Sequence, residues 1–194
     1  MTGKVITMNT YEIEIKLPIA DKYSVQTKLL QLGFAVAAKI RECDIYYNSA
    51  YHDVKKLGEA LRIRKSTDLL TGITKAQINF KGKKIDKVSM SRQEYETVVE
   101  DADSMEQILK SLNFLPVAGV TKTRIYLQRE KMTACLDQVD GLGDFLELEV
   151  IDKEEKFREI HLKNMSHLLA QLGLSMEDTV TTSYLGMLMG ERRY

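Results

Sequence analysis

The chain has 194 residues, of which 44% are hydrophobic and 29% charged, a composition typical of a globular protein with a substantial core. Lysine plus arginine and aspartate plus glutamate both number 28, so the net charge is zero. This balance argues against a general binder of nucleic-acid polymers or of anionic membranes. Any binding of phosphate groups must therefore come from the local placement of charge.

The cysteine and histidine content also indicates the cellular compartment and the kind of metal that could bind. Two cysteines, Cys43 and Cys135, make no disulfide framework and are typical of a reducing, cytoplasmic protein. The three histidines lack zinc-ligand spacing, so a metal would be bound by oxygen, as magnesium, manganese or calcium is. No apolar run approaches the roughly 18 residues of a membrane helix, and residues 1–10 lack a signal-peptide core. Because no linker-like stretch occurs, we expect one domain over residues 1–194.

The pattern of apolar residues predicts eight strands and three helices in an α+β arrangement. A first helix, capped by Asp21, should end before Gly33. A second should be capped by Asp103 or Ser104 and bury Met105, Ile108, Leu109 and Leu112. A third should cover residues 153–172 and end at Gly173. The predicted strands are residues 11–17, 43–47, 59–66, 75–81, 91–99, 122–128, 133–139 and 144–151.

A short internal repeat accompanies the first two helices. The segment from Leu29 to Phe34 resembles the segment from Ile108 to Phe114, and each is followed by Lys, Arg and an Ile-Tyr pair. Each is also preceded by a strand with two acids two residues apart. The repeat predicts two related strand–helix–strand halves that could close one barrel. A chance match is the alternative.

Charged residues alternate with apolar ones along most of the predicted strands. In residues 11–17, Glu12, Glu14 and Lys16 share one face, because successive strand side chains point to opposite faces. Two carboxylates at this spacing can share a divalent cation, and the lysine can hold an anion beside it. The same alternation gives the charged sets Arg62/Arg64, Lys122/Arg124 and Glu147/Glu149, and it sets Asp137 opposite Leu136.

These charged faces allow two interpretations. For a single strand, the simpler one is an antiparallel sheet with one face in water. For the whole set we favour a closed sheet with helices over its apolar outer face and charges inside. About eight strands enclose room for side chains or one small ligand. Unpartnered charges there would cost several kcal/mol each, so an interior rich in both signs suits a metal–polyphosphate complex.

Several charged motifs follow one another over nearly the whole chain. In order they are Glu12-Ile13-Glu14-Ile15-Lys16, Glu59-Ala60-Leu61-Arg62-Ile63-Arg64, Phe80-Lys81-Gly82, Arg92-Gln93-Glu94-Tyr95-Glu96, Lys122-Thr123-Arg124, Asp137 and Gly141-Leu142-Gly143-Asp144-Phe145-Leu146-Glu147-Leu148-Glu149. Together they resemble the CYTH superfamily, the triphosphate tunnel metalloenzymes.

Within this superfamily, the segments that look most like the CyaB-type class IV adenylyl cyclases are Glu42–Tyr47, Gly141–Phe145 and Ser183 to Leu188. The full triple of Arg92, Glu94 and Glu96 and the pair of Glu147 and Glu149 are at least as typical of the triphosphatases.

The resemblance implies a closed eight-stranded antiparallel β-barrel forming a triphosphate tunnel, with helices packed outside. It also implies Mg²⁺ or Mn²⁺, ATP or another triphosphate as substrate, a cytoplasmic location and the homodimer that family members often form. The implied metal ligands are Glu12, Glu14, Asp137, Glu147 and Glu149, which with Lys16 form the implied catalytic set. The implied phosphate-binding residues are Lys16, Arg62, Arg64, Lys81, Arg92, Lys122 and Arg124.

Three functions are compatible with these residues. The first is an adenylate cyclase that converts ATP to cyclic AMP and pyrophosphate. The second is an inorganic, thiamine or nucleoside triphosphatase, in which water attacks a terminal phosphorus. The third is a non-catalytic polyphosphate or nucleotide sensor, against which the acids argue because simple anion binding needs no carboxylates.

Overall fold

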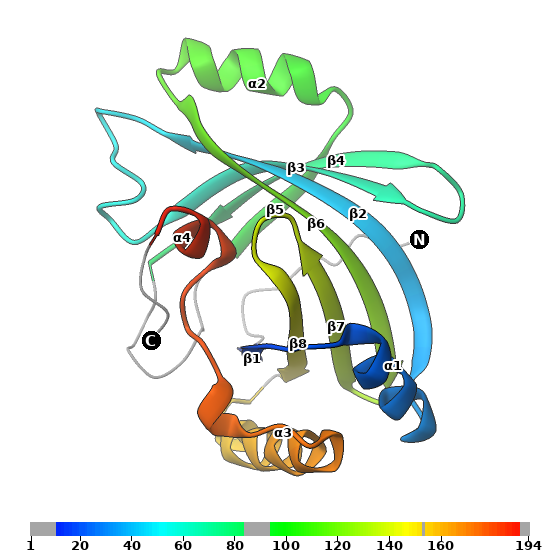
Figure 1. Ribbon diagram of the computed structural model, residues 1–194. Coiled ribbons are helices and arrows are strands. Elements are labelled where there is room, and N and C mark those ends of the chain that lie inside the picture. The colour runs from blue at the N-terminus through cyan, green and yellow to red at the C-terminus, as the bar shows by residue number, and fades with distance from the viewer. Residues whose placement is uncertain (1–10, 84–93, 153, 191–194) are drawn as a thin grey trace. The chain divides into compact units, whose positions relative to one another are not determined.

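The computed structural model describes residues 11–83, 94–152 and 154–190 (Figure 1). All eight predicted strands are present, and β2 and β6 are longer than the sequence predicts. The elements in chain order are β1 (Tyr11–Pro18), α1 (Lys22–Gln31), β2 (Ala35–Asn48), β3 (Ala60–Asp68), β4 (Thr74–Lys81), β5 (Glu94–Val99), α2 (Ala102–Ser111), β6 (Leu115–Arg129), β7 (Met132–Val139), β8 (Gly143–Asp152), the 3₁₀ turn η1 (Glu155–Phe157), α3 (Arg158–Leu172), the 3₁₀ turn η2 (Met176–Asp178) and α4 (Tyr184–Leu188).

The strands form one eight-stranded sheet in the order β1-β8-β7-β6-β2-β3-β4-β5. The pairs β1–β8, β8–β7, β7–β6, β2–β3, β3–β4 and β4–β5 are all antiparallel. This confirms the predicted α+β class with an antiparallel sheet. Over the part of the chain that is described, the order has two ends, at β1 and β5. Closure of the sheet into a barrel therefore stays a prediction.

The chain divides into two compact units. Among the described residues, the first contains 40–83 and 94–121, and the second contains 11–39, 122–152 and 154–190. The long strands β2 and β6 contribute residues to both units. The predicted single domain over residues 1–194 stays a prediction, and each unit is described below by itself.

Helices α1 and α2 end with the same local geometry, as the internal repeat predicts. Gly33 and Asn113 follow the two helices with φ values of 87° and 63°. These left-handed conformations favour glycine and asparagine, and they let the next amide turn back onto the helix. The amide of Phe34 donates to the carbonyl of Leu29 at 3.0 Å, and the amide of Phe114 donates to that of Leu109 at 2.9 Å. A long strand follows in both cases.

The predicted caps of α2 are wrong by a few residues. Asp101 is the N-cap, in an extended conformation, and its carboxylate accepts from the amides of Asp103 and Ser104. The Ser104 hydroxyl donates to the same carboxylate at 2.6 Å. Asp101, Asp103 and Ser104 are all favourable capping residues, and the one that precedes the first helical residue is the cap. The corresponding prediction for α1 is confirmed, because the Asp21 carboxylate accepts from two amides there.

Only one row of α2 is buried. Leu109 is 6% exposed and joins Tyr47 and Ile63 in a small cluster of the first unit, with Met105 packed against it. Ile108 and Leu112 are 52% and 61% exposed, so their predicted burial is wrong. Because this helix packs on β3, a single sheet surface covers only part of its apolar stripe.

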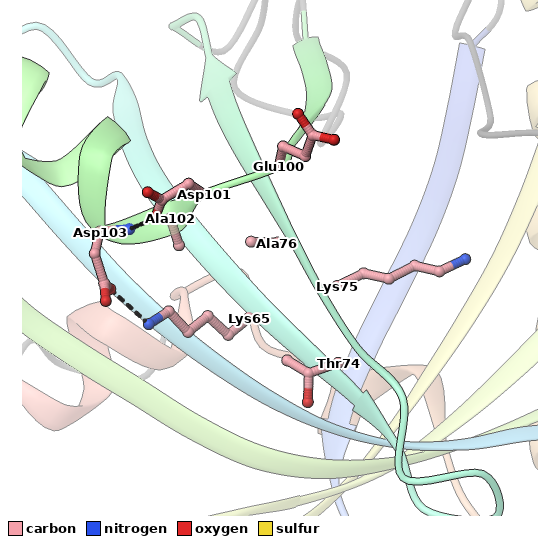
Figure 2. A pocket seen from close by; sticks show the side chains of 8 residues that line it. All are labelled: Lys65, Thr74, Lys75, Ala76, Glu100, Asp101, Ala102 and Asp103. Atoms are coloured by element: carbon pink, nitrogen blue, oxygen red, sulfur yellow. Dashed lines mark hydrogen bonds and ion pairs between the residues drawn. The ribbon is translucent and has the colours of Figure 1, made fainter.

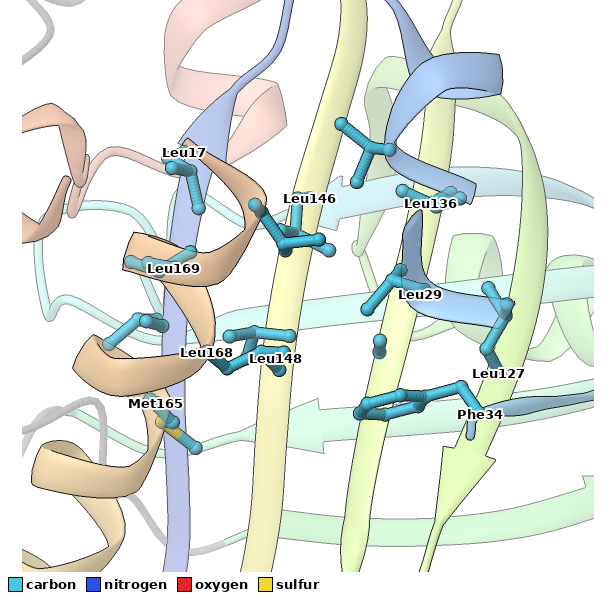
Figure 3. Close-up of a cluster of buried hydrophobic side chains, with 14 of the residues drawn as sticks. Leu17, Leu29, Phe34, Leu127, Leu136, Leu146, Leu148, Met165, Leu168 and Leu169 are labelled. Carbon is cyan, nitrogen blue, oxygen red and sulfur yellow. The ribbon is translucent and has the colours of Figure 1, made fainter. Parts of the chain in front are cut away.

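The second unit has the larger core, between helices α1 and α3 and the apolar face of its strands (Figure 3). Leu17, Leu146 and Leu136 come from β1, β8 and β7 and are all 0% exposed. Leu29 of α1 and Leu168 of α3 pack onto that surface. As predicted, helices α1 and α3 cover the apolar sides of these strands, so the charged sides face away from these two helices.

Helix α3 begins later than predicted but ends where the sequence indicates. A 3₁₀ turn, Glu155–Phe157, precedes it, and the helix covers Arg158–Leu172. Gly173 ends it in the left-handed conformation, with φ 79°. Among the described residues, no helix is long and apolar enough to cross a membrane.

Replacing Leu148 with alanine should destabilise the protein, because this side chain is 0% exposed and lies in the core of the second unit. We expect a loss of about 2–5 kcal/mol in the free energy of unfolding, measured by urea denaturation. Leu30→Ala is the matched control in the same unit, because Leu30 is 45% exposed, and it should change stability by less than about 1 kcal/mol. Equal losses in the two variants would contradict the position of this core.

Candidate functional site

The strand register in the second unit brings the charged sides of four strands together. Lys16 lies opposite Glu147, and Glu147 lies opposite Cys135 on its other side. Two residues further along β7, Asp137 lies opposite Phe145 of β8 on one side and Arg124 of β6 on the other. These rows alternate with the leucine rows of the core, since neighbouring strand residues point to opposite faces. The sequence pattern alone predicted these faces correctly.

Asp137 is the centre of a buried ionic cluster. Its side chain is 0% exposed, and each of its oxygens accepts hydrogen bonds. Arg124 donates from Nε to Oδ1 and from Nη2 to Oδ2, both at 2.5 Å, in a bidentate arrangement. Lys122 Nζ donates to Oδ2 at 3.0 Å. The carboxylate thus fixes two cations, and the metal-ligand role predicted for Asp137 stays a prediction.

Glu147 and Lys16 extend the cluster to β8 and β1. Glu147 is 8% exposed and accepts a hydrogen bond from Arg124 Nη2. Lys16 is 5% exposed and lies in the field of the Glu147 carboxylate. Three basic side chains and two acids are therefore held together, all with less than one tenth of their surface exposed.

The electrostatics of the cluster keep its acids ionised. Burial alone would raise the pKa of Asp137, but Arg124 and Lys122 outweigh it and hold that pKa well below its usual value. Glu147 behaves similarly, because Arg124 lowers its pKa against the effect of burial. Burial lowers the pKa of the Lys16 ammonium, and the carboxylates of Glu147 and Glu14 oppose that shift.

Two buried residues of this cluster were absent from the predicted site. Tyr184 of α4 donates its hydroxyl hydrogen to Asp137 Oδ2 at 2.9 Å. Burial and the nearby Glu147 and Asp137 carboxylates raise the pKa of Tyr184 well above its usual value, so the phenol stays protonated. Cys135 is 1% exposed, and burial raises its pKa to about 12, which makes it an unreactive thiol. The cyclase-like segment from Ser183 to Leu188 was the available signal for Tyr184.

A pair of carboxylates lies in the next row of the same face. Glu14 of β1 is directly opposite Glu149 of β8. Side chains in this relation have Cβ atoms about 5 Å apart, and like charges there destabilise a sheet. A divalent cation bound by oxygen would relieve that repulsion. The pair therefore fits the predicted Mg²⁺ or Mn²⁺ by its donor chemistry.

The other predicted acids add less information about a metal. The backbone of Glu12 lies opposite Ile151, and its side chain is outside the described residues. Among the residues that the structure describes, no group of three or more His, Cys, Asp or Glu side chains is already arranged around a metal position. The metal-ligand roles of Glu12, Glu14, Glu147 and Glu149 stay predictions.

The first unit contains a second cluster of buried charge. Arg64 donates from Nε and Nη2 to the two oxygens of Asp44, at 2.6 and 2.7 Å. Arg62 Nη1 donates to Asp44 Oδ2 at 3.1 Å and to the hydroxyl of Tyr46 at 3.3 Å. Glu42 lies 3.1 Å from Arg64 Nη1. Sequence reasoning proposed both arginines but missed the acids, although Glu42, Asp44 and Tyr46 alternate along one face of β2.

Lys81, another predicted phosphate ligand, is the last residue of β4. Lys81 is partly buried and lies opposite Glu94 in the sheet register. Arg92 and the side chain of Glu94 are outside the described residues. On the same face of these strands, Glu96 accepts hydrogen bonds from Gln77 at 2.8 Å and from Asn79 at 3.2 Å.

An open pocket of the first unit lies apart from the predicted site residues (Figure 2). Strands β3 and β4 and the start of α2 line it, and Lys65 forms an ion pair with Asp103 across it at 3.0 Å. None of the predicted ligands lines this pocket. The Asp103 side chain is 82% exposed, so the ion pair is a surface contact.

Comparison with known proteins identifies the family. The CYTH domain family matches residues 10–184. The "Putative adenylate cyclase MJ0240" of Methanocaldococcus jannaschii is 37% identical over 174 residues, covering 90% of this chain and 96% of that protein. The "Adenylate cyclase CyaB" of Aeromonas hydrophila is 26% identical over 175 residues, covering 90% of this chain and 86% of that protein.

Solved structures show the same fold. The PH1819 protein of Pyrococcus horikoshii is 33% identical and superposes with a TM-score of 0.82, covering 94% of this chain and all of that one. HpAC1 from Hippeastrum, described as a putative adenylyl cyclase with a dominant triphosphatase activity, is 17% identical. Its TM-score is 0.66 over 94% of this chain and 97% of its own. At this identity the likeness concerns the fold alone.

Removing the Asp137 carboxylate should destabilise the protein strongly. Asp137→Ala leaves the buried Lys122 and Arg124 with too little negative charge, and breaking such pairs costs about 3–5 kcal/mol. The control is Asp103→Ala, whose exposed pair with Lys65 should contribute less than about 1 kcal/mol. Urea denaturation at neutral pH measures both losses. Comparable losses in the two variants would show that the Asp137 cluster does not stabilise the fold.

Proposed function

Because the chain belongs to the CYTH family, we propose that it binds a triphosphate with Mg²⁺ or Mn²⁺ and acts as an adenylate cyclase. The reaction converts ATP to cyclic AMP and pyrophosphate. The observation that carries this proposal is the gathering of Lys16, Lys122 and Arg124 with two buried acids, next to the Glu14–Glu149 pair. The cyclase names of the two curated relatives support the choice of reaction.

The basic residues would bind the triphosphate chain. Lys16 and Lys122 offer ammonium groups to phosphate oxygens, and both are held in a desolvated cluster where charge–charge attraction is stronger than in water. Arg124 is fixed by Asp137 and Glu147, so it contributes a positive charge of constant position. In the cyclase reaction the ribose 3′-oxygen attacks the α-phosphorus, the bond to the bridging oxygen breaks, and pyrophosphate leaves with the electron pair.

The acids would hold the cation. Glu14 and Glu149, with Glu12 and Glu147 beside them on the same strands, supply the oxygen donors. The cation, when bound, would supply positive charge that acidifies the 3′-hydroxyl and stabilises the leaving pyrophosphate. The proton of that hydroxyl would pass to solvent or to a carboxylate. Asp137 is assigned to holding Lys122 and Arg124 in place.

We extend the proposed phosphate site to Arg62, Arg64, Lys81 and Arg92. The buried cluster of Arg62 and Arg64 with Asp44 supports the part of the first two arginines, because it holds their guanidinium groups in fixed directions. The family motifs support the part of Lys81 and Arg92, and they also support closure of the sheet into a tunnel, a cytoplasmic location and a homodimer.

A triphosphatase is the second candidate. Glu147 and Glu149 are both present on β8, and this pair is one part of a pattern that is at least as typical of the triphosphatase members. The other part is the sequence triple of Arg92, Glu94 and Glu96. HpAC1, which shares the fold, is described as having a dominant triphosphatase activity. In that reaction water attacks a terminal phosphorus and releases orthophosphate. The same charges would serve both reactions, which differ in the nucleophile.

Product analysis separates these functions. The protein is incubated with MnCl₂ or MgCl₂ and, separately, with ATP, tripolyphosphate and thiamine triphosphate. Cyclic AMP with equimolar pyrophosphate from ATP is the expected result. Orthophosphate from any of the three would overturn the cyclase in favour of the hydrolase. Metal-dependent binding without turnover would leave a sensor and refute both enzymes.

Neutralising one member of the carboxylate pair should weaken metal binding without unfolding the protein. Glu14→Gln and Glu149→Gln should raise the metal concentration needed for half-maximal turnover at least about tenfold. Both variants should stay folded, because glutamine has nearly the same size and shape as glutamate. A Mn²⁺ titration of activity and a urea denaturation curve measure the two effects.

The control for this pair is Glu177→Gln, an exposed acid of η2. It should leave both the metal titration and the stability unchanged. If Glu14→Gln retained the metal dependence of the unsubstituted protein, the assignment of β1 to the metal site would be wrong.

A further inference from the structure

Tyr184 contacts the charged cluster through both its hydroxyl and its ring. It is 8% exposed, although it stands at the start of a helix of only five residues. Its hydroxyl donates to Asp137 Oδ2 at 2.9 Å. Its ring packs edge-on against Phe145, with 5.0 Å between the ring centroids and 67° between the planes. These contacts fix both the direction of the hydroxyl and the plane of the ring.

The ring also faces two ammonium groups. Lys16 Nζ lies 4.5 Å from the ring centroid and Lys122 Nζ lies 5.1 Å from it. The two lysines come from different strands, β1 and β6, and their like charges repel each other. The face of an aromatic ring is electron-rich and attracts cations, most strongly where water is excluded. One ring thus lies within cation–π distance of two ammonium groups.

The chain fixes this ring next to β1 by a backbone contact. The amide of Val180 donates to the carbonyl of Lys16 at 2.7 Å, which attaches the segment before α4 to the strand at the lysine itself. Ser183 then caps α4 by accepting from the amide of Gly186 at 3.1 Å. The position of the ring over Lys16 is therefore set by backbone hydrogen bonds as well as by packing.

We propose that Tyr184 is a positioning residue for triphosphate binding, in which the ring holds the Lys16 and Lys122 ammonium groups together as a pair of phosphate ligands. The hydroxyl has a separate part, since it helps to orient the Asp137 carboxylate that holds Lys122. This inference rests on the proposed function, because it takes the two lysines as triphosphate ligands. It assigns a role to the C-terminal segment that strand alternation cannot reveal.

Two substitutions separate the ring from the hydroxyl. Tyr184→Phe keeps the ring and should bind tripolyphosphate within about threefold of the original affinity. Tyr184→Leu removes the ring and should weaken binding about tenfold, the effect expected for the loss of buried cation–π contacts. Isothermal titration with tripolyphosphate measures both. The matched control is Tyr23→Leu, which removes an exposed ring (69% exposed) near Lys22 and should leave binding unchanged.

If Tyr184 acted only by stabilising the fold, the affinity for tripolyphosphate would fall together with the free energy of unfolding in both variants. Urea denaturation of both Tyr184 variants tests this, because the proposal expects Tyr184→Phe to lose stability while keeping its affinity. In turnover with ATP and MnCl₂, Tyr184→Leu should raise KM about tenfold and change kcat less. Tripolyphosphate binding by Tyr184→Leu equal to that of the original protein would overturn the proposal, as would a parallel loss of affinity in Tyr184→Phe.

Nuclear magnetic resonance tests the geometry even if the reaction is not found. In protein labelled with ¹³C-lysine, the ε-methylene signals of Lys16 and Lys122 should be shifted upfield by the ring, and Lys16→Arg and Lys122→Arg assign them. Tyr184→Phe should keep the shifts and Tyr184→Leu should abolish them. Ordinary positions for both signals in the original protein would overturn the inference. Upfield shifts with no turnover of any triphosphate would instead refute the proposed enzyme and leave the ring contacts standing.

Discussion

The buried carboxylate of Asp137 is the interaction on which the rest of the second unit depends. Two cations and a phenol converge on it from β6 and α4, and all of them are largely removed from water. Charges in such a place are tolerated only if each has partners of opposite sign and good geometry. The carboxylate supplies them, and it thereby fixes β6, β7 and the C-terminal segment relative to one another within this unit.

The same strand alternation produces both the core and the charged cluster. Leu136 and Asp137 are neighbours in β7, and one is packed under the helices while the other binds Arg124. A slip of one residue in the register would exchange these faces and bury leucines among charges. The antiparallel register is therefore held from both sides, by apolar packing on one face and ion pairs on the other. Stability and the charged site depend on one geometric condition.

Sequence reasoning succeeded where the determining interactions are local. Alternation of side chains correctly placed Lys16, Arg124 and Asp137 on one type of face, because strand geometry alone fixes that property. The end of α1 at Gly33 was predictable for a similar reason, since the left-handed conformation there favours glycine. The eight strands followed from the same kind of local signal, whereas the antiparallel arrangement was implied by the family resemblance.

Sequence reasoning failed where a side chain's contacts depend on residues that are distant in sequence. Tyr184 reaches Asp137 from a position 47 residues along the chain, and no periodicity relates the two. The pairing of Arg64 with Asp44 likewise depends on the register between β2 and β3. For α2, the apolar stripe gave the helix correctly, but the exposure of Ile108 depends on which surface covers the helix. Local patterns indicate on which face of a strand or helix a side chain lies, and only the fold determines which residues that face contacts.

The contacts also suggest a division of labour between arginine and lysine. Arg124 presents a planar fork, and its bidentate bond to Asp137 together with its bond to Glu147 sets its direction. Lysine is a compact charge on a flexible stem with three donor hydrogens, so Lys122 can hold Asp137 and a phosphate oxygen at the same time. Exchanging such a contact for a phosphate costs less than opening a bidentate ion pair. Under the proposed function, the lysines would therefore meet the triphosphate first, and Arg124 with Asp137 would form the rigid support behind them.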